Sequence, residues 1–97
     1  MEYDDLFEWD DIKNNKNIIK HGVNFQEAST VFRDPNAVVM DDSDHSHNEE
    51  RFIIIGVSEK LRMLIVCHCY RDNDELIRII SARKASKVEI NIYGGVK

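Results

Sequence analysis

The stretch Arg51–Ser81, RFIIIGVSEKLRMLIVCHCYRDNDELIRIIS, decides the fold. Three runs within it are rich in Ile, Val, Leu and Phe, and they span residues 51–57, 62–71 and 76–81. Polar links of hairpin length join these runs. Because consecutive strands with such short links pair antiparallel, the stretch predicts the body of a small antiparallel sheet.

A short strand and a helix are expected at the start of the chain. Phe7–Asp10 indicates a strand whose last residue can cap the segment that follows. Ile12, Ile19 and Val23 then recur at helical spacing, so they predict a helix with this apolar face buried. Gly22 fits the left-handed C-cap that ends it.

A second, shorter helix precedes the sheet. Asn24 as N-cap and Glu27 three residues later match a capping box, and Pro35 stops the helix. Ala37–Met40 is a compact apolar run of strand length. The polar run Asp41–Glu50 after it is typical of a surface loop.

One more helix is expected after the sheet. Residues 82–93 place Val88 and Ile92 on one side, with Ser81 or Ser86 as N-cap. The order strand, helix, helix, sheet, helix predicts an α+β fold, with a small antiparallel sheet of three to four strands, two N-terminal helices and one C-terminal helix. The length of 97 residues fits a single domain, 1–97.

The charge balance differs between the two halves of the chain. The net charge of -5 argues against a protein that binds phosphates over its whole surface. Residues 1–50 carry four basic and thirteen acidic residues, a balance of −9, whereas residues 51–97 carry nine and five, a balance of +4. This asymmetry indicates a local cationic surface for nucleic acid, and the alternative is that both signs mix after folding.

The sequence favours the cytoplasm as compartment. No apolar run approaches the roughly 18 residues that a membrane span needs, and no apolar signal region is present, so no membrane contact is expected. Cys67 and Cys69 share a face of one predicted strand, where a relaxed disulfide between them is disfavoured. Both are expected to be reduced thiols that pack as small apolar groups, rather than a redox or metal site.

Histidines are candidates for proton transfer or metal binding. His68 shares its strand face with apolar neighbours, so it is either half buried or lines a cleft, where an imidazole can act as general acid or base. The alternative is a core histidine satisfied by one hydrogen bond. His45 and His47 lie in the acidic loop, but their spacing is not specific for a metal, and none is expected.

Cations gather in the second half of the chain. Each of these cations, taken alone, is expected to be a solvated surface charge. Together, arginines projected from strands can bind a phosphodiester bidentately and stabilise a pentavalent transition state. In the first half, Lys20 and His21 adjoin at a helix C-terminus, where positive charge complements the macrodipole. Trp9 fits the core, or alternatively a stacking site for a base. The cations in or beside the sheet and last helix are Arg51, Arg62, Arg71, Arg78, Arg83, Lys84 and Lys87.

Taken together, the motifs resemble the BrnT family. They run in order from residue 7 to about residue 93 and comprise Phe7-Glu8-Trp9-Asp10, Lys20-His21-Gly22-Val23 with Phe25 and Glu27-Ala28, Val31-Phe32 before Asp34-Pro35, His45-Ser46 with Glu49-Glu50-Arg51-Phe52, Ile55-Gly56, and Arg78-Ile79-Ile80-Ser81-Ala82-Arg83-Lys84-Ala85. The resemblance implies a toxin of a bacterial type II toxin-antitoxin system with a fold similar to RelE-type ribonuclease toxins. It also implies a BrnA-like antitoxin, a ribbon-helix-helix protein that would link the toxin to operator DNA.

The activity that the resemblance implies is endoribonuclease cleavage without metal or cofactor, which lowers translation and halts growth. In RelE-like chemistry the ribose 2′-hydroxyl attacks the adjacent phosphorus, so the enzyme positions the chain, moves two protons and neutralises the phosphorane. Carried onto this sequence, the expected catalytic residues are Lys20, His21, Glu50, Arg51, Arg78 and Arg83, with His45 and His68 as further proton-transfer candidates. The expected substrate-binding residues are Trp9, His45 and Lys84.

Within this set, Arg78 and Arg83 are expected to hold phosphate, Glu50 or a histidine to move the proton, and Arg51 to assist or to orient Glu50. Strict strand alternation places Arg78 and Arg83 on opposite faces, so they converge only if the strand ends near Ser81 and Arg83 starts the helix. A competing hypothesis is a non-catalytic module that acts as co-repressor with the antitoxin. A third is a plain metal-binding or scaffold domain.

Overall fold

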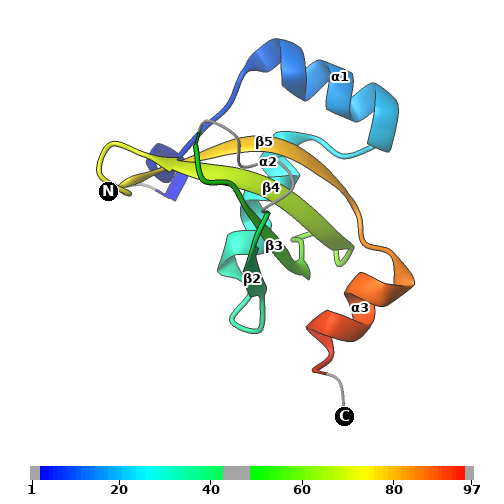
Figure 1. Ribbon diagram of the computed structural model, residues 1–97. Coiled ribbons are helices and arrows are strands. Elements are labelled where there is room, and N and C mark those ends of the chain that lie inside the picture. The colour runs from blue at the N-terminus through cyan, green and yellow to red at the C-terminus, as the bar shows by residue number, and fades with distance from the viewer. Residues whose placement is uncertain (1–2, 43–48, 96–97) are drawn as a thin grey trace.

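Five strands form one sheet in the order β1-β5-β4-β3-β2 in the computed structural model, which describes residues 3–42 and 49–95 (Figure 1). The helices and strands, in chain order, are η1 Tyr3–Leu6, β1 Phe7–Glu8, α1 Asp11–His21, α2 Phe25–Thr30, η2 Val31–Arg33, β2 Val38–Asp41, β3 Phe52–Val57, β4 Met63–Arg71, β5 Leu76–Lys84 and α3 Lys87–Tyr93, where η marks a 3-10 helix. The α+β class is therefore confirmed.

The sheet is larger and less uniform than predicted. Strands β2 to β5 pair antiparallel, as expected, but β1 adds a fifth strand that runs parallel to β5, with Phe7 opposite Ile77 and Glu8 opposite Arg78. The prediction of three to four antiparallel strands is thus corrected to a mixed sheet of five. The reason is that a two-residue strand pairs with residues about 70 positions away, which no local pattern reveals.

Strand β5 continues past Ser81, where the sequence pattern predicted its end. Arg83 and Lys84 still pair with residues of β4, because β4 is long enough to offer them partners. The last helix therefore starts at Lys87 rather than at residue 82, behind an N-cap at Ser86 that forms a complete capping box with Glu89.

A β-bulge in β5 changes which side of the sheet its arginines occupy. Cys67 lies opposite Ser81, and the next residue of β4, His68, lies opposite Ile79, so Ile80 is an extra residue in β5. The extra residue reverses the alternation, and Arg78 and Arg83 come to lie on the same face. The strand end at Ser81, on which the predicted convergence of Arg78 and Arg83 depended, is therefore wrong, although the two arginines do share a face.

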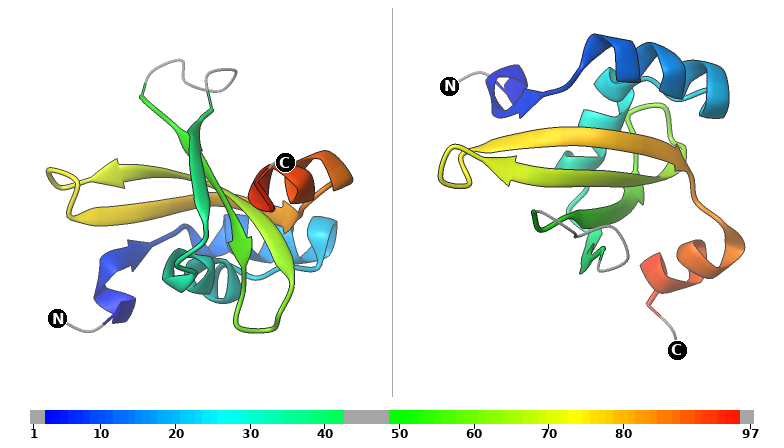
Figure 2. Two further views of the ribbon diagram at one scale, coloured as in Figure 1. Left: turned by 90° about the horizontal axis from the view of Figure 1, so that it is seen from below. Right: turned by 45° about the horizontal axis from the view of Figure 1, so that its top comes forward.

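The hydrophobic core lies between the sheet and the helices α2 and η2, and α3 lies on the opposite side of the sheet (Figure 2). Paired positions of three strands supply the core face of the sheet, among them Ile54, Val66 and Ala82. From the helix side, Phe25 and Val31 are fully buried against it. Where β3 passes the end of η2, only glycine fits at position 56, because a Cβ there would lie 2.9 Å from Val31 Cγ1.

Helix α1 turns its polar side to the protein, contrary to the prediction. Ile12 and Ile19 are 67% and 87% exposed, and the buried residue of the helix is Asn17. The Asn17 amide donates to the carbonyl of Ala82 at 2.7 Å and accepts from the Ala82 N–H at 3.1 Å. Strand β1 pairs only with Ile77 and Arg78, so it does not reach Ala82. The Asn17 side chain therefore makes the hydrogen bonds to Ala82 that a neighbouring strand would otherwise make. Packing of Ile12 and Ile19 inward would leave this backbone without partners.

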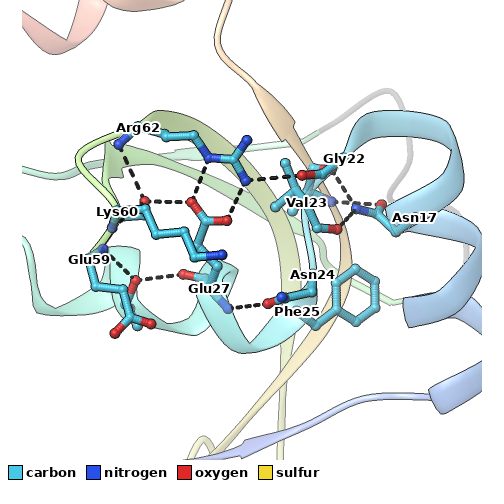
Figure 3. A network of polar contacts seen from close by, with 12 residues as sticks. Asn17, Gly22, Val23, Asn24, Phe25, Glu27, Glu59, Lys60 and Arg62 are labelled. Carbon is cyan, nitrogen blue, oxygen red and sulfur yellow. Dashed lines mark hydrogen bonds and ion pairs between the residues drawn. The ribbon is translucent and has the colours of Figure 1, made fainter.

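An ion pair between the buried Glu27 and the half-buried Arg62 joins α1, α2 and the β3-β4 turn (Figure 3). Glu27 is 1% exposed, and its carboxylate accepts from Arg62 and, at 2.7 Å, from the Ser58 hydroxyl. Arg62 also donates to the carbonyl of Gly22, which has the left-handed conformation expected for the C-cap of α1. Asn24 caps α2 as predicted. The predicted capping box is only half formed, because the Glu27 carboxylate binds Arg62 instead of the Asn24 N–H.

Among the described residues, no helix is both long and apolar enough to cross a bilayer.

Candidate functional site

A hollow of about 400 Å³ opens on the side of the sheet that faces away from α2. Its floor comes from paired positions of β3, β4 and β5, and its rim comes from the end of α1, the start of α3 and the two chain segments beside β2 and β3. We call it the sheet hollow. The residues that line it are Lys20, His21, Asp42, Arg51, Ile53, Ile65, Cys67, Ile80, Ser81, Ala82, Arg83 and Glu89.

Four of the predicted catalytic residues meet in the sheet hollow: Lys20, His21, Arg51 and Arg83. The Asn17 amide fixes α1 against Ala82 of β5, so the last turn of the helix brings Lys20 and His21 to the rim. The bulge in β5 allows Arg83 to lie on the face of the sheet that carries the hollow. Three cationic side chains and one imidazole therefore surround one opening in a chain of net charge -5.

Arg83 is held by a carboxylate that the sequence pattern did not single out. Its Nη1 and Nη2 atoms each donate to one carboxylate oxygen of Glu89, both at 2.8 Å, and Nη1 also donates to the carbonyl of Lys84. Glu89 also accepts from the Ser86 N–H at 2.7 Å. Hydrogen bonds from Arg83, supported by that of Ser86, lower the pKa of Glu89 to about 2 against its burial, and the same pairing raises the pKa of Arg83.

This geometry leaves one edge of the Arg83 guanidinium open. The end-on edge, made by Nη1 and Nη2, binds Glu89, and no described residue accepts from Nε. The side chain of Arg83 is 45% exposed and that of Glu89 is 17% exposed, so the carboxylate is the more buried partner. The side-on edge of an arginine, Nε with one Nη, matches two oxygens of a phosphate.

The opposite wall of the sheet hollow contains Arg51, Asp42 and Cys67. The Cys67 thiol donates to the Asp42 carboxylate across 3.5 Å, and the Asp42 N–H donates to the carbonyl of Arg51 at 2.9 Å. Burial, with the Asp42 contact, raises the pKa of Cys67 to about 11, so the sulfur is a neutral thiol near pH 7. Both Cys67 and Cys69 are unbridged, as predicted.

Arg78 and Glu50, by contrast, lie outside the sheet hollow. Arg78 is on the same face as Arg83 but five residues away along β5, and it pairs with Glu8 of β1 at 2.8 Å. At roughly 3.3 Å per residue the two arginines are about 15 Å apart, too far to clamp one phosphate. Glu50 is exposed and lines a separate, shallow opening with Phe52, Tyr70 and Asp74.

His68 lies on the core face of β4, where it is fully buried. Its ring packs edge-on against Phe32 and Tyr70, with centroid distances of 4.8 and 5.4 Å. Burial lowers its pKa, so the ring is neutral, and its Nε2 atom has no hydrogen-bond partner among the described residues. Of the two interpretations that the sequence allowed, the structure fits the core histidine.

Two of the residues expected to bind substrate, Trp9 and Lys84, do not line the sheet hollow. Trp9 is half-buried and packs edge-on against Phe25 on the helix side, with a centroid distance of 6.2 Å. Lys84 is exposed at the end of β5 and does not line the hollow. His45 and His47, with most of the acidic loop, lie outside the described residues. Within the described ranges no cluster of three or more His, Cys, Asp or Glu could hold a metal ion.

Sequence reasoning missed Glu89, Asp42 and Ser81 as lining residues. The pattern Ser86-x-x-Glu89 signals a capping box, and so marks Glu89 as a residue of the first helical turn. Its ion pair with Arg83 has no such signal, because it depends on where β5 ends.

Comparison with known proteins agrees with this architecture. Residues 9–89 match the family model described as ribonuclease toxin, BrnT, of type II toxin-antitoxin system. The crystal structure of the Brucella abortus ribonuclease toxin BrnT is similar to this structure, with a TM-score of 0.63 and 26% sequence identity over 84% of this chain and 96% of that chain. No curated protein sequence matches. Because the family model covers most of the chain, from Trp9 to Glu89, the chain belongs to the BrnT family of ribonuclease toxins of type II toxin-antitoxin systems.

Proposed function

We propose that the sheet hollow is the RNA-cleaving site of a metal-independent endoribonuclease. The observation that supports this most is the meeting of Lys20, His21, Arg51 and Arg83 around one opening. Cleavage by the ribose 2′-hydroxyl needs a group that moves protons and cations that neutralise the phosphorane, and this set contains both.

In the proposed reaction, His21 takes the proton of the 2′-hydroxyl, whose oxygen then bonds to the adjacent phosphorus. The bond from phosphorus to the 5′-oxygen breaks, and that oxygen receives a proton from the imidazolium of His21 or from Lys20. The products are a 2′,3′-cyclic phosphate and a 5′-hydroxyl, so no water or metal ion is consumed. Histidine suits this exchange because imidazole both accepts and returns protons near neutral pH.

Arg83 and Arg51 are proposed to bind the scissile phosphate from opposite walls. Glu89 holds the end-on edge of Arg83, which leaves Nε and Nη2 for two phosphate oxygens. This differs from the sequence-based hypothesis in one way, because Arg51 replaces Arg78 as the second phosphate ligand. Of the two proton-transfer groups that the sequence left open, Glu50 or a histidine, the proposal takes a histidine, His21.

The biological setting is proposed from the family. RNA cleavage in the cytoplasm would lower translation and arrest growth until a BrnA-like ribbon-helix-helix antitoxin binds the toxin and links it to operator DNA. A RelE-like reaction scheme belongs to the same proposal.

The test is cleavage of a labelled RNA with excess EDTA, followed by analysis of the ends produced. Wild-type protein should yield cyclic phosphate and 5′-hydroxyl ends. Arg83→Ala should slow cleavage roughly 100-fold, and His21→Ala by about 100-fold or more. The matched control is Arg71→Ala, which removes an exposed cation outside the hollow.

Three results would count against the proposal. Equal losses in the Arg71 and Arg83 variants would place the activity elsewhere, and loss of cleavage in EDTA would show a metal requirement. RNA left intact, with normal growth on induction without antitoxin, would instead support the co-repressor module.

A further inference from the structure

Helix α1 presents an apolar surface that the fold itself does not use. Ile12 and Ile19 are 67% and 87% exposed, and Ile18 beside them is 41% exposed. Ile12 and Ile19 are seven residues apart, about two turns or 10 Å along one side of the helix. Lys16 falls between them on the same side, at position i+4 from Ile12.

This surface cannot be turned inward. The opposite side of α1 carries Asn17, which is bound to Ala82 of β5, and Asn14, whose side chain accepts from the Phe25 N–H at 2.8 Å. Rotation of the helix to bury Ile12 and Ile19 would break all of these hydrogen bonds. The outward isoleucines are therefore a permanent feature of the folded chain, and their side chains are available for contact with another molecule.

The charges around the isoleucines limit which molecule fits. Lys13, Lys16 and Lys20 are all exposed on α1, in a half of the chain whose balance is −9. A partner that covers this helix must bring apolar side chains for the isoleucines and carboxylates for the lysines.

A protein partner fits this chemistry better than RNA or a membrane does. The outer side of α1 has no aromatic residue and no arginine, the side chains on which bases stack. A bilayer surface is disfavoured because the helix has 11 residues without Trp or Phe, on a chain of net charge -5. A type II toxin-antitoxin system, in contrast, includes a protein antitoxin.

We propose that the outer side of α1 is the docking surface for an acidic, amphipathic segment of the antitoxin. Ile12 and Ile19 anchor its apolar side chains, and Lys13 and Lys16 pair with its carboxylates. The surface ends at Lys20 and His21, which line the sheet hollow. A segment bound along α1 therefore reaches the rim of the proposed cleavage site, which explains how one contact both binds and silences the toxin. Only this last step rests on the proposed function.

The experiment is to express the toxin with the antitoxin of its own operon and to measure the dissociation constant of the purified pair by titration calorimetry. Ile12→Asn with Ile19→Asn should weaken the complex at least tenfold, and Lys13→Glu with Lys16→Glu should do the same. The matched control is Val39→Asn with Leu61→Asn, which removes two other exposed apolar residues, 51% and 86% exposed, away from α1. It should leave the affinity unchanged.

Zero-length carbodiimide cross-linking of the wild-type complex provides the second measurement. Lys13 or Lys16 should be joined to aspartate or glutamate residues of the antitoxin, as identified by mass spectrometry. Each α1 variant is also assayed for binding to a 2′-O-methyl RNA and to vesicles of phosphatidylglycerol and phosphatidylcholine. For each variant, the affinities for RNA and for vesicles should match those of wild type.

Unchanged antitoxin affinity in the two α1 variants would overturn the inference, as would cross-links confined to other lysines. Loss of RNA or vesicle binding with normal antitoxin affinity would overturn it in favour of those partners. Because the affinity is measured without cleavage, the docking surface can fail while Arg83→Ala still slows cleavage, and the reverse outcome would reject the proposed function alone.

Discussion

Arg83 has an ion-pair partner that its position in the sequence does not reveal. It lies on a regular strand, yet its guanidinium is bound end-on by Glu89 of the following helix. An arginine without such a partner would sample many rotamers, and ordering it on the substrate would cost entropy at each binding event. In the proposed reaction, the ion pair with Glu89 orders the Arg83 side chain before RNA binds.

This arrangement predicts energetic coupling between the two residues in the cleavage reaction. Glu89→Gln keeps an oxygen for the Ser86 N–H but removes the charge that holds Arg83, so cleavage should fall roughly tenfold, a coupling of about 1.4 kcal/mol. In the Arg83→Ala background the same change should cost nothing further. The measurement is a double-mutant cycle on the rate of RNA cleavage, with Ser86→Ala as a control that removes the cap but keeps the ion pair.

A loss that is the same in both backgrounds would mean that Glu89 acts through the stability of α3 rather than through Arg83. Faster cleavage in Glu89→Gln would mean that the carboxylate competes with the phosphate.

At the scale of single elements, α3 depends on the same carboxylate. Glu89 has a pKa of about 2 in the folded chain and an ordinary value of 4.5. Because the folded state favours the charged form, the stabilisation is complete above about pH 4.5 and is lost as the pH falls toward 2. Urea unfolding of wild type and Glu89→Gln should therefore show a difference in unfolding free energy at pH 7 that shrinks near pH 2.5. A difference that stays constant would rule out this origin.

Helix α1 makes a second prediction at this scale, because its polar side is the structural one. Asn17→Ala leaves the backbone N–H and carbonyl of Ala82 buried without partners, at a cost of about 2 to 4 kcal/mol. Ile12→Asn with Ile19→Asn changes only exposed side chains, so unfolding free energy should stay within about 0.5 kcal/mol. Urea denaturation of both variants gives the comparison. The opposite ranking would mean that α1 packs by its isoleucines, as its sequence alone suggested.

Sequence patterns predicted the elements better than the contacts between them. Apolar runs and hairpin links located β3 and β4 to within a residue or two, since both signals are local. The orientation of α1 was not predictable from its isoleucines, because a single asparagine outweighs them by pairing with an unprotected strand edge. The sheet hollow depends on the extra residue Ile80, and a bulge of this kind leaves no mark in a run such as Ile79-Ile80-Ser81.

At the scale of the whole molecule, the net charge of -5 conceals the proposed site. Three cations around the sheet hollow should contact few phosphates, so the affinity for RNA should depend only weakly on salt concentration. With three phosphates neutralised, the slope of log affinity against log salt for single-stranded RNA should be about −2. Fluorescence anisotropy with a 2′-O-methyl RNA between low and physiological salt measures it. A slope steeper than about −4 would indicate that cations across the surface take part.

The asparagine that joins α1 to β5 also has a consequence for how these molecules behave together. Beyond the two residues of β1, the backbone of β5 would present an open edge on which a strand of another copy could add, the first step toward fibrous aggregates. Asn17 occupies the donor and acceptor of Ala82 on that edge. At this edge the helix therefore prevents strand addition by another copy of the chain.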